Sequence, residues 1–221
     1  MLAALAVGGV LELDPATGRY RLPPEHAASL TRAAGGDNVG VFAQYIAVLG
    51  AVEDDVVRCF REGGGVPYSR YGRFHEVMAE DSGLSVVAAL FDHILPLVPG
   101  LIERLEAGIR VLDLGCGRGR ALLAMAERFP RSTFTGYDLS EEAIAWGAAQ
   151  ARERGLGNLR LEVRDLSTYD RDAAPEAHDL VTTFDAVHDQ PRPAALLAGI
   201  RRTLAPADAE NTEALVSAYL S

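Results

Sequence analysis

The feature that most constrains the fold is an alternation of strand-like and helix-like segments between residues 109 and 206. Short apolar runs typical of strands are followed by longer amphipathic runs typical of helices. The expected strands are 109–115, 132–138, 159–165 and 178–184, and the expected helices are 120–129, 140–155 and 193–206. Because parallel strands need crossover connections of about this length, the pattern predicts an α/β fold with a Rossmann-like, doubly wound parallel sheet.

A glycine-rich turn joins the first expected strand to its helix, with Gly115, Gly117 and Gly119 in a G-x-G-x-G spacing. This spacing departs from the dinucleotide fingerprint G-x-G-x-x-G, and no G-K-[ST] follows as in a phosphate-binding loop. Asp113 stands two residues before the first glycine, where a carboxylate would repel a pyrophosphate and attract an ammonium group. The turn is therefore predicted to hold a ligand without phosphates.

Two further acids end the next expected strands. Asp138 can accept hydrogen bonds from both hydroxyls of a ribose, and Asp165 can accept one from the exocyclic amine of an adenine. Such charge-assisted bonds contribute about 1.5–3 kcal/mol each. Any one of these acids could equally cap a helix or face solvent. The three together, around a glycine turn, predict a site for an adenosine that carries an amino acid, which is S-adenosylmethionine.

The segments "VLDLGCGRG", "GYDLS" and the "RD" after the third strand resemble the class I S-adenosylmethionine-dependent methyltransferases, with their D-x-G-x-G-x-G motif. The resemblance implies that Gly115 and Gly117, with Cys116 between them, let the methionine part of the cofactor approach the backbone. Asp113 would hold the ammonium group through water or the loop amides, and Asp138, beside Leu139, would hold the ribose.

The same resemblance places further residues around the cofactor. Asp165 and Leu166 would flank the adenine, and Phe184 and Asp185 would close the other side. His188 is the candidate catalytic base, because it follows the fourth strand, where the substrate meets the methyl group in this fold; a turn histidine without chemistry is the alternative. Cys116 is expected to serve as a small residue and not as a nucleophile.

Residues "YRLPPEHAASLTR", "YSRYGRFHEVMAEDS" and "TFDAVHDQPRP" resemble a bacterial and metazoan group of methyltransferases that carry an N-terminal winged-helix module. By this resemblance residues 1–34 are a partial winged helix, a hairpin and a helix. Residues 35–107 are a helical linker or lid, 108–206 the cofactor-binding domain and 207–221 an atypical tail. Tyr68, Tyr71 and Phe74, with His75, are expected either to cover the cofactor or to pack between helices.

The C-terminal part departs from the family. After the fourth helix the family continues with P-G-G and strands five to seven, whereas "ADAENTEALVSAYLS" stands here. Strands five to seven are therefore expected to be missing, which leaves the fourth strand as an open, aggregation-prone edge. A replacement helix capped by Asn211 or Thr212 is favoured over a strand. With only the back half of the winged helix present, the chain looks truncated at both ends, and a non-catalytic methyltransferase fragment is one alternative.

The composition limits the classes of partner that the chain is expected to bind. The formal net charge is -10, which disfavours nucleic acid as the chief partner. The two cysteines, Cys59 and Cys116, support neither a disulfide framework nor a metal site, so a cytoplasmic location is expected. No segment has the roughly 20 apolar residues needed to span a bilayer. The arginines of the loop and the following helix are expected to form a solvated face: Arg118, Arg120, Arg128 and Arg131.

The sequence thus predicts an S-adenosylmethionine-dependent methyltransferase with a small-molecule acceptor, and leaves a homodimer open. The alternative is a ligand-sensing transcription regulator that binds DNA through its winged helix. Residues 1–50 hold three basic and four acidic residues, whereas a DNA-reading module would be basic. We therefore favour the methyltransferase over the transcription regulator.

Overall fold

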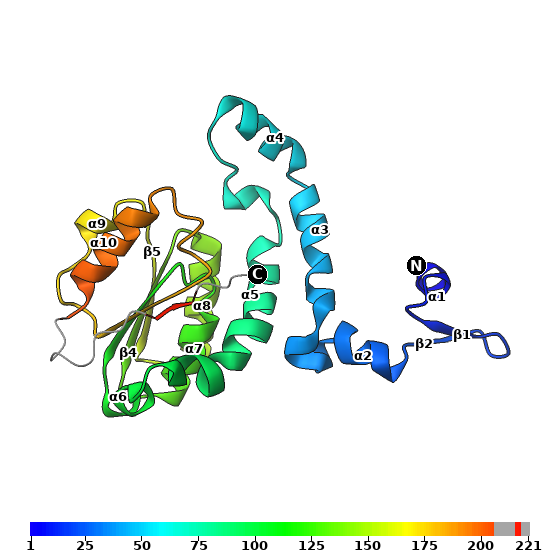
Figure 1. Cartoon of the computed structure of the whole chain (residues 1–221), viewed down its shortest axis with the longest axis horizontal. Coiled ribbons are helices and arrows are strands. Elements are labelled where there is room, and N and C mark those ends of the chain that lie inside the picture. The colour runs from blue at the N-terminus through cyan, green and yellow to red at the C-terminus, as the bar shows by residue number, and fades with distance from the viewer. Residues whose placement is uncertain (206–214, 218–221) are drawn as a thin grey trace. The chain divides into compact units, whose positions relative to one another are not determined.

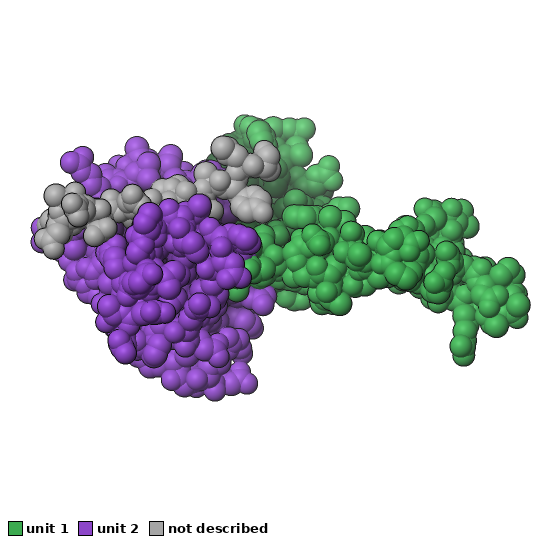
Figure 2. Space-filling view, turned by 60° about the horizontal axis from the view of Figure 1, so that its bottom comes forward, with its two compact units in different colours: residues 1–88 green, residues 89–221 purple. Residues whose placement is uncertain are grey.

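The structure is a computed structural model that describes residues 1–205 and 215–217. The chain divides into two compact units, residues 1–88 and 89–221 (Figure 2). Their boundary lies inside the segment that the sequence assigned to a helical linker, 35–107.

Unit 1 begins with α1 (Leu2–Val7), followed by the antiparallel hairpin of β1 (Glu12–Asp14) and β2 (Arg19–Arg21), and by α2 (Pro24–Leu30). The hairpin turn is fixed by Asp14, whose carboxylate accepts from the Ala16 amide at 2.9 Å and from the Thr17 hydroxyl at 2.6 Å. The expected hairpin and helix are confirmed. Their assignment to a winged helix stays a prediction.

The rest of unit 1 is helical. Its elements are η1 (Arg32–Asp37), η2 (Val39–Val41), α3 (Ala43–Gly50), α4 (Glu53–Glu62), η3 (Tyr68–Arg70), α5 (Phe74–Ser82) and η4 (Gly83–Val87). α3 ends at Gly50, and α4 then begins with three acids, which favourably complement a helix N-terminus.

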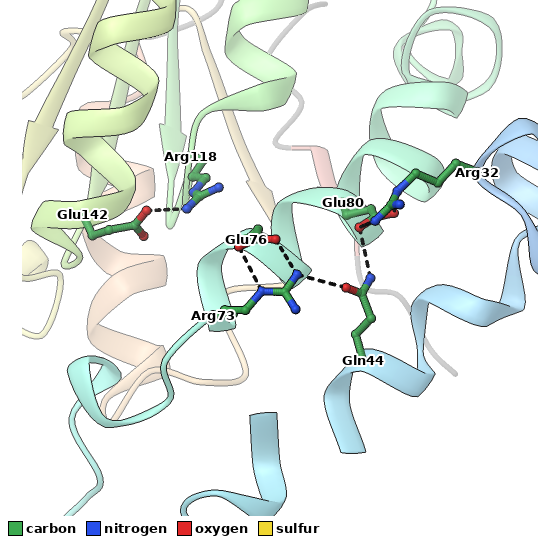
Figure 3. Close-up of polar contacts among 7 residues, drawn as sticks. All are labelled: Arg32, Gln44, Arg73, Glu76, Glu80, Arg118 and Glu142. Atoms are coloured by element: carbon green, nitrogen blue, oxygen red, sulfur yellow. Dashed lines mark hydrogen bonds and ion pairs between the residues drawn. The ribbon is translucent and has the colours of Figure 1, made fainter. Parts of the chain in front are cut away.

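A polar network joins three elements of unit 1 (Figure 3). Glu80 on α5 accepts from Arg32 at 2.7 Å and from the Gln44 amide at 3.0 Å. Arg73 donates to Gln44 at 3.3 Å and also pairs with Glu76. The network thus links η1 and α3 to α5.

The aromatic residues of unit 1 pack against one another. The rings of Tyr68 and Phe74 are stacked with centroids 5.5 Å apart, and Tyr71 lies 5.5 Å from the same Phe74 ring. The His75 ring is 5.0 Å from that of Tyr68. These distances are typical of aromatic pairs in a packed cluster. The expected cover over the cofactor stays a prediction.

Unit 2 is an α/β domain (Figure 1). Its helices are η5 (Leu90–Ile94), η6 (Leu95–Leu97), α6 (Leu101–Ala107), α7 (Arg120–Arg128), α8 (Glu141–Glu153), α9 (Tyr169–Asp172) and α10 (Pro193–Thr203). Its strands are β3 (Arg110–Leu114), β4 (Thr133–Asp138), β5 (Leu159–Val163), β6 (Leu180–Phe184) and β7 (Leu215–Ser217). All pairs in the sheet are parallel, in the order β5-β4-β3-β6-β7. The predicted α/β class, the four predicted strands and their connecting helices are confirmed.

Helices cover the sheet on both faces, α7 and α8 on one and α9 and α10 on the other (Figure 1). The α9–α10 side forms a buried cluster that includes Leu112, Val181, Leu196 and Tyr169. The central strands β3 and β6 are buried along nearly their whole length. This explains why they are continuous apolar runs in the sequence rather than alternating ones.

The prediction for the C-terminal part is wrong in one respect. Residues 215–217 form β7, which pairs with β6 through Thr182↔Leu215 and Phe184↔Ser217. The fourth strand is therefore not an open edge, and these residues are not part of a replacement helix. An exposed edge of a buried strand offers unpaired amides and carbonyls, which a short β-prone segment can satisfy. Asn211 and Thr212, the expected helix caps, lie outside the described residues.

No helix within residues 1–205 has the length and apolar character required to cross a membrane.

Candidate functional site

The candidate site lies where the strand order reverses. From β3 the chain adds β4 and β5 on one side, then returns to place β6 on the other side of β3. The carboxyl ends of β3 and β6 are therefore neighbours, and the helices that follow these strands, α7 and α10, lie on opposite faces of the sheet (Figure 1). In open α/β sheets such a switch point opens the crevice in which ligands bind. The loop after β3 is the glycine loop, residues 115–119, and residues 185–192 follow β6.

The glycine loop is held against the end of β4. The amides of Gly115 and Cys116 both donate to the Tyr137 carbonyl, at 2.8 and 3.1 Å. Gly115 has a φ of 76°, and a Cβ there would lie 2.3 Å from the Cβ of Ala186. Only glycine therefore allows the loop after β6 to approach this closely.

Gly117 is different, because the space around it is open. Its φ is 53°, and a Cβ built there meets no atom within 4 Å. Its amide donates to Asp138 Oδ2 at 2.8 Å. Because Gly117 has no side chain, a ligand can approach its main chain closely, and the bond to Asp138 holds that main chain in place.

Asp138 ends β4, and both of its oxygens are positioned. Oδ2 accepts from Gly117, and Oδ1 accepts from the Ser140 amide at 2.8 Å. Ser140 in turn caps α8, because its hydroxyl oxygen accepts from the Ala143 amide. Each carboxylate oxygen has a second lone pair, so Asp138 keeps acceptor capacity for a further pair of hydroxyls. Leu139, beside it, is exposed.

Asp113 is buried beneath the loop with 2% of its surface exposed. Its Oδ1 accepts from the Thr182 hydroxyl at 2.9 Å across the β3–β6 pair. Burial raises the pKa of Asp113 to about 7; the Thr182 hydrogen bond opposes this, and the charge of Asp138 adds to it. A cation bound nearby would favour the ionised form of this carboxyl group.

Asp165 and Leu166, after β5, face in different directions. Asp165 is exposed, and its Oδ1 accepts from the Ser167 amide at 2.8 Å. Leu166 is buried in the cluster under α9 and α10. The structure thus leaves the Asp165 carboxylate accessible, whereas the Leu166 side chain contributes to the core.

The residues expected from the end of β6 and the loop after it lie nearer to solvent. Phe184 is half-buried, and Asp185 is exposed with a φ of 55°. His188 is 63% exposed, with Nδ1 at 3.5 Å from an Asp185 oxygen and Nε2 at 3.3 Å from an Asp189 oxygen. Two carboxylates thus flank the imidazole.

The Cys116 side chain lies against β4, where a Cβ built at Gly136 would be 2.8 Å from Cys116 Sγ. Burial raises the pKa of its thiol well above the usual range, and the charges of Asp113 and Asp138 add to this effect. A thiol of this kind is a poor nucleophile. Within the described residues, no group of three or more His, Cys, Asp or Glu side chains could hold a metal ion.

Three residues of the site were not predicted. Thr182 and Ala186 contact Asp113 and Gly115 only because of the strand register, which the sequence pattern does not reveal. Arg118 was expected on a solvated face, and this is wrong, because its side chain is 15% exposed and lies against α8. The sequence signal that could have indicated this position of Arg118 is Trp146, an aromatic residue on the next helix.

Comparison with known proteins agrees with this geometry. Residues 105–209 match the family model described as "Methyltransferase domain". The nocamycin O-methyltransferase of Saccharothrix syringae is 44% identical over 59 residues, which are 26% of this chain and 21% of the relative. The ubiquinone biosynthesis O-methyltransferase of Pseudomonas savastanoi pv. phaseolicola (strain 1448A / Race 6) is 33% identical over 101 residues, 45% of this chain and 41% of the relative.

The chain thus spans less than half of the length of these two curated relatives. A solved structure described as "PigF with SAH" is similar in fold, with a TM-score of 0.60 at 20% identity, over 93% of this chain and 62% of that one. Together the family model and these relatives show that residues 105–209 are similar to a methyltransferase domain.

Proposed function

We propose that this chain is an S-adenosylmethionine-dependent methyltransferase that acts on a small-molecule acceptor. The observation that carries the proposal is the bond between the Gly117 amide and Asp138, at a switch point where the backbone beyond Gly117 is open. A bare glycine backbone suits the methionine part of the cofactor, and an oriented carboxylate suits its ribose.

Ten residues would hold the cofactor: Asp113, Gly115, Cys116, Gly117, Asp138, Leu139, Asp165, Leu166, Phe184 and Asp185. The exposed Asp165 carboxylate would accept from the adenine amine. Leu166 would contribute through its main chain, because its side chain is in the core. The buried Asp113 would act at longer range on the ammonium group, through water or the loop amides.

When bound, S-adenosylmethionine supplies a methyl group already activated by its sulfonium. The protein then has to align the acceptor and remove a proton where the acceptor is an oxygen or a nitrogen. We assign the proton to His188 Nε2 or Nδ1, with Asp185 and Asp189 stabilising the imidazolium that results.

A small-molecule acceptor is favoured on two grounds. The loop after β6 reads "TFDAVHDQ" and has no N-P-P-Y-like motif, which disfavours methylation of an amide or of an adenine amine. Two relatives are named as O-methyltransferases of nocamycin and of ubiquinone biosynthesis. The acidic net charge of -10 also disfavours a nucleic-acid acceptor.

Calorimetric titration with S-adenosylhomocysteine tests the cofactor site. The wild-type chain should bind, and Asp138→Ala should weaken binding at least about tenfold, because it removes one or two charge-assisted hydrogen bonds of about 1.5–3 kcal/mol each. Asp92→Ala, an exposed acid on η5, is the matched control and should bind like the wild type. No binding by the wild type at millimolar ligand would refute the proposal.

A panel of phenolic and carboxylic acceptors, with methyl transfer read from a labelled cofactor, tests the acceptor class. His188→Gln should reduce turnover without changing the Kd for S-adenosylhomocysteine. Methylation of RNA or DNA in preference to every small molecule would contradict the acceptor assignment.

A further inference from the structure

Arg118 belongs to the glycine loop, yet its side chain is turned onto α8 (Figure 3). The guanidinium pairs with the Glu142 carboxylate and lies over the Trp146 ring, with 5.1 Å between its central carbon and the ring centroid. Glu142 and Trp146 are four residues apart on α8 and so share one face of the helix. Arg118 thus makes an ion pair and a cation–π contact at once.

The main chain of Arg118 is also close to α8. A Cβ built at Gly147 would lie 2.6 Å from the Arg118 carbonyl oxygen. Gly147 follows Trp146 directly, so the missing side chain lets the loop backbone reach the helix beside the stacked guanidinium. Both the side chain and the carbonyl of Arg118 are therefore held by the first two turns of α8.

Gly117, which precedes Arg118, belongs to the candidate site and donates its amide to Asp138. The loop is short and closed, because the Gly119 amide donates to the Cys116 carbonyl at 2.8 Å. A displacement of the Arg118 main chain is therefore expected to disturb Gly117 as well. The contacts on α8 thus bear directly on the bond that orients Asp138.

The charge of Arg118 gives the arrangement a second consequence. A guanidinium turned toward the open side of Gly117 would repel a cationic ligand, whereas one stacked on Trp146 is paired with Glu142. Only 15% of the side chain is exposed, so little solvent screens its charge. Holding Arg118 on α8 therefore keeps a positive charge out of the site.

We propose that Arg118, Trp146 and Glu142 form a clamp that positions the glycine loop and thereby sets the affinity for the adenosyl cofactor. This inference rests on the proposed function. Arg118 is a positioning residue, because it acts through Gly117 and Asp138 and not by contact with the cofactor.

The test compares the Kd for S-adenosylhomocysteine among clamp variants by calorimetry. Arg118→Met keeps the apolar stem and removes the charge and the stacking, and should raise the Kd about tenfold, since cation–π and partly buried ion-pair contacts together are of this order. Trp146→Leu should weaken binding similarly. Trp146→Phe keeps an aromatic face and should stay within about threefold of the wild type.

The matched control is Arg160→Met. Arg160 also forms an ion pair with a glutamate, Glu162 at 2.5 Å, but it is 77% exposed and lies on β5 outside the loop. It should leave the Kd unchanged. Arg118→Lys, which keeps the charge, serves as a second variant should Arg118→Met fold poorly, and should give an intermediate Kd.

Trp146 is the single tryptophan of the chain, so its fluorescence reports on the clamp directly. Arg118→Met should shift the emission spectrum of the ligand-free protein, whereas Arg160→Met should not. Addition of S-adenosylhomocysteine should change the wild-type emission, because the loop and α8 are joined.

The outcomes separate this inference from the proposed function. A wild type that does not bind S-adenosylhomocysteine overturns both. A wild type that binds, with Arg118→Met within twofold of its Kd, overturns the clamp alone. If Arg118→Met binds more weakly but Trp146→Leu does not, the effect is due to charge, and the clamp is overturned. If Arg160→Met loses as much affinity as Arg118→Met, the effect is due to general stability, and the clamp is likewise overturned.

Discussion

Asp113→Asn tests the central electrostatic feature of the site, a buried carboxyl group whose pKa is raised. Asp113 is 2% exposed, and it accepts a hydrogen bond from the Thr182 hydroxyl. Burial raises its pKa to about 7 from the ordinary 3.8. In the absence of a cationic ligand, ionisation of Asp113 therefore costs stability, and the neutral asparagine avoids that cost.

The sign follows from proton linkage. A carboxyl group with a raised folded-state pKa binds its proton more tightly in the folded chain than in the unfolded chain. Its contribution to stability is fully present below about pH 3.8 and is lost as the pH rises through about 7. At about 1.4 kcal/mol per pH unit, the gap between these values corresponds to about 4 kcal/mol.

Urea unfolding followed by Trp146 fluorescence measures this effect, because the single tryptophan lies in unit 2. Between pH 4.5 and 8.5 the wild type should lose about 3 kcal/mol of stability relative to Asp113→Asn. Thr182→Val removes the opposing hydrogen bond and should move the wild-type transition to higher pH. Parallel pH profiles of the wild type and Asp113→Asn would refute the reasoning, as would a transition centred below pH 5.

The remaining predictions concern binding, the loop and one ion pair. The ammonium group of the ligand favours ionised Asp113, so the affinity for S-adenosylhomocysteine should rise about tenfold from pH 6 to pH 8 in the wild type, in calorimetric titrations, and clearly less in Asp113→Asn. Gly115→Ala should cost at least about 2 kcal/mol in urea unfolding, from the positive φ and the contact with Ala186, while Gly157→Ala, with open space around it, should be nearly neutral. The hydrogen bond from the Arg110 guanidinium lowers the pKa of Asp179, so Asp179→Asn should destabilise by about 1 kcal/mol at pH 7. The difference should shrink below the ordinary 3.8 and be lost as the pH falls through the lowered pKa of Asp179; a constant penalty in urea unfolding would contradict this.

Local patterns were enough for much of unit 2. The β3–loop–α7 segment, the Ser140 cap and Asp138 at a strand end follow from short-range rules of alternation, capping and glycine turns. The bond between Asp138 and Gly117 was not predicted as such. Its placement follows, however, once β3 and β4 are known to be parallel neighbours.

The C-terminal strand shows where local patterns fail. Residues 215–217 have no strong strand signal of their own, and they are a strand because β6 offers an unpaired edge. Whether a segment meets such an edge depends on the rest of the fold. The same holds for Arg118, which looked like one more solvated arginine until α8 placed Trp146 beside it.

The class of fold, the position of the glycine loop and the acids at the strand ends could therefore be predicted from the amino-acid sequence, because each depends on residues close together along the chain. The environments of those groups follow from long-range packing. Strand register brought Thr182 to Asp113 and Ala186 to Gly115, and the packing of α8 removed Arg118 from solvent. A pKa, a clamp or a paired edge is a property of distance and burial, and these are set by contacts between residues remote in the sequence.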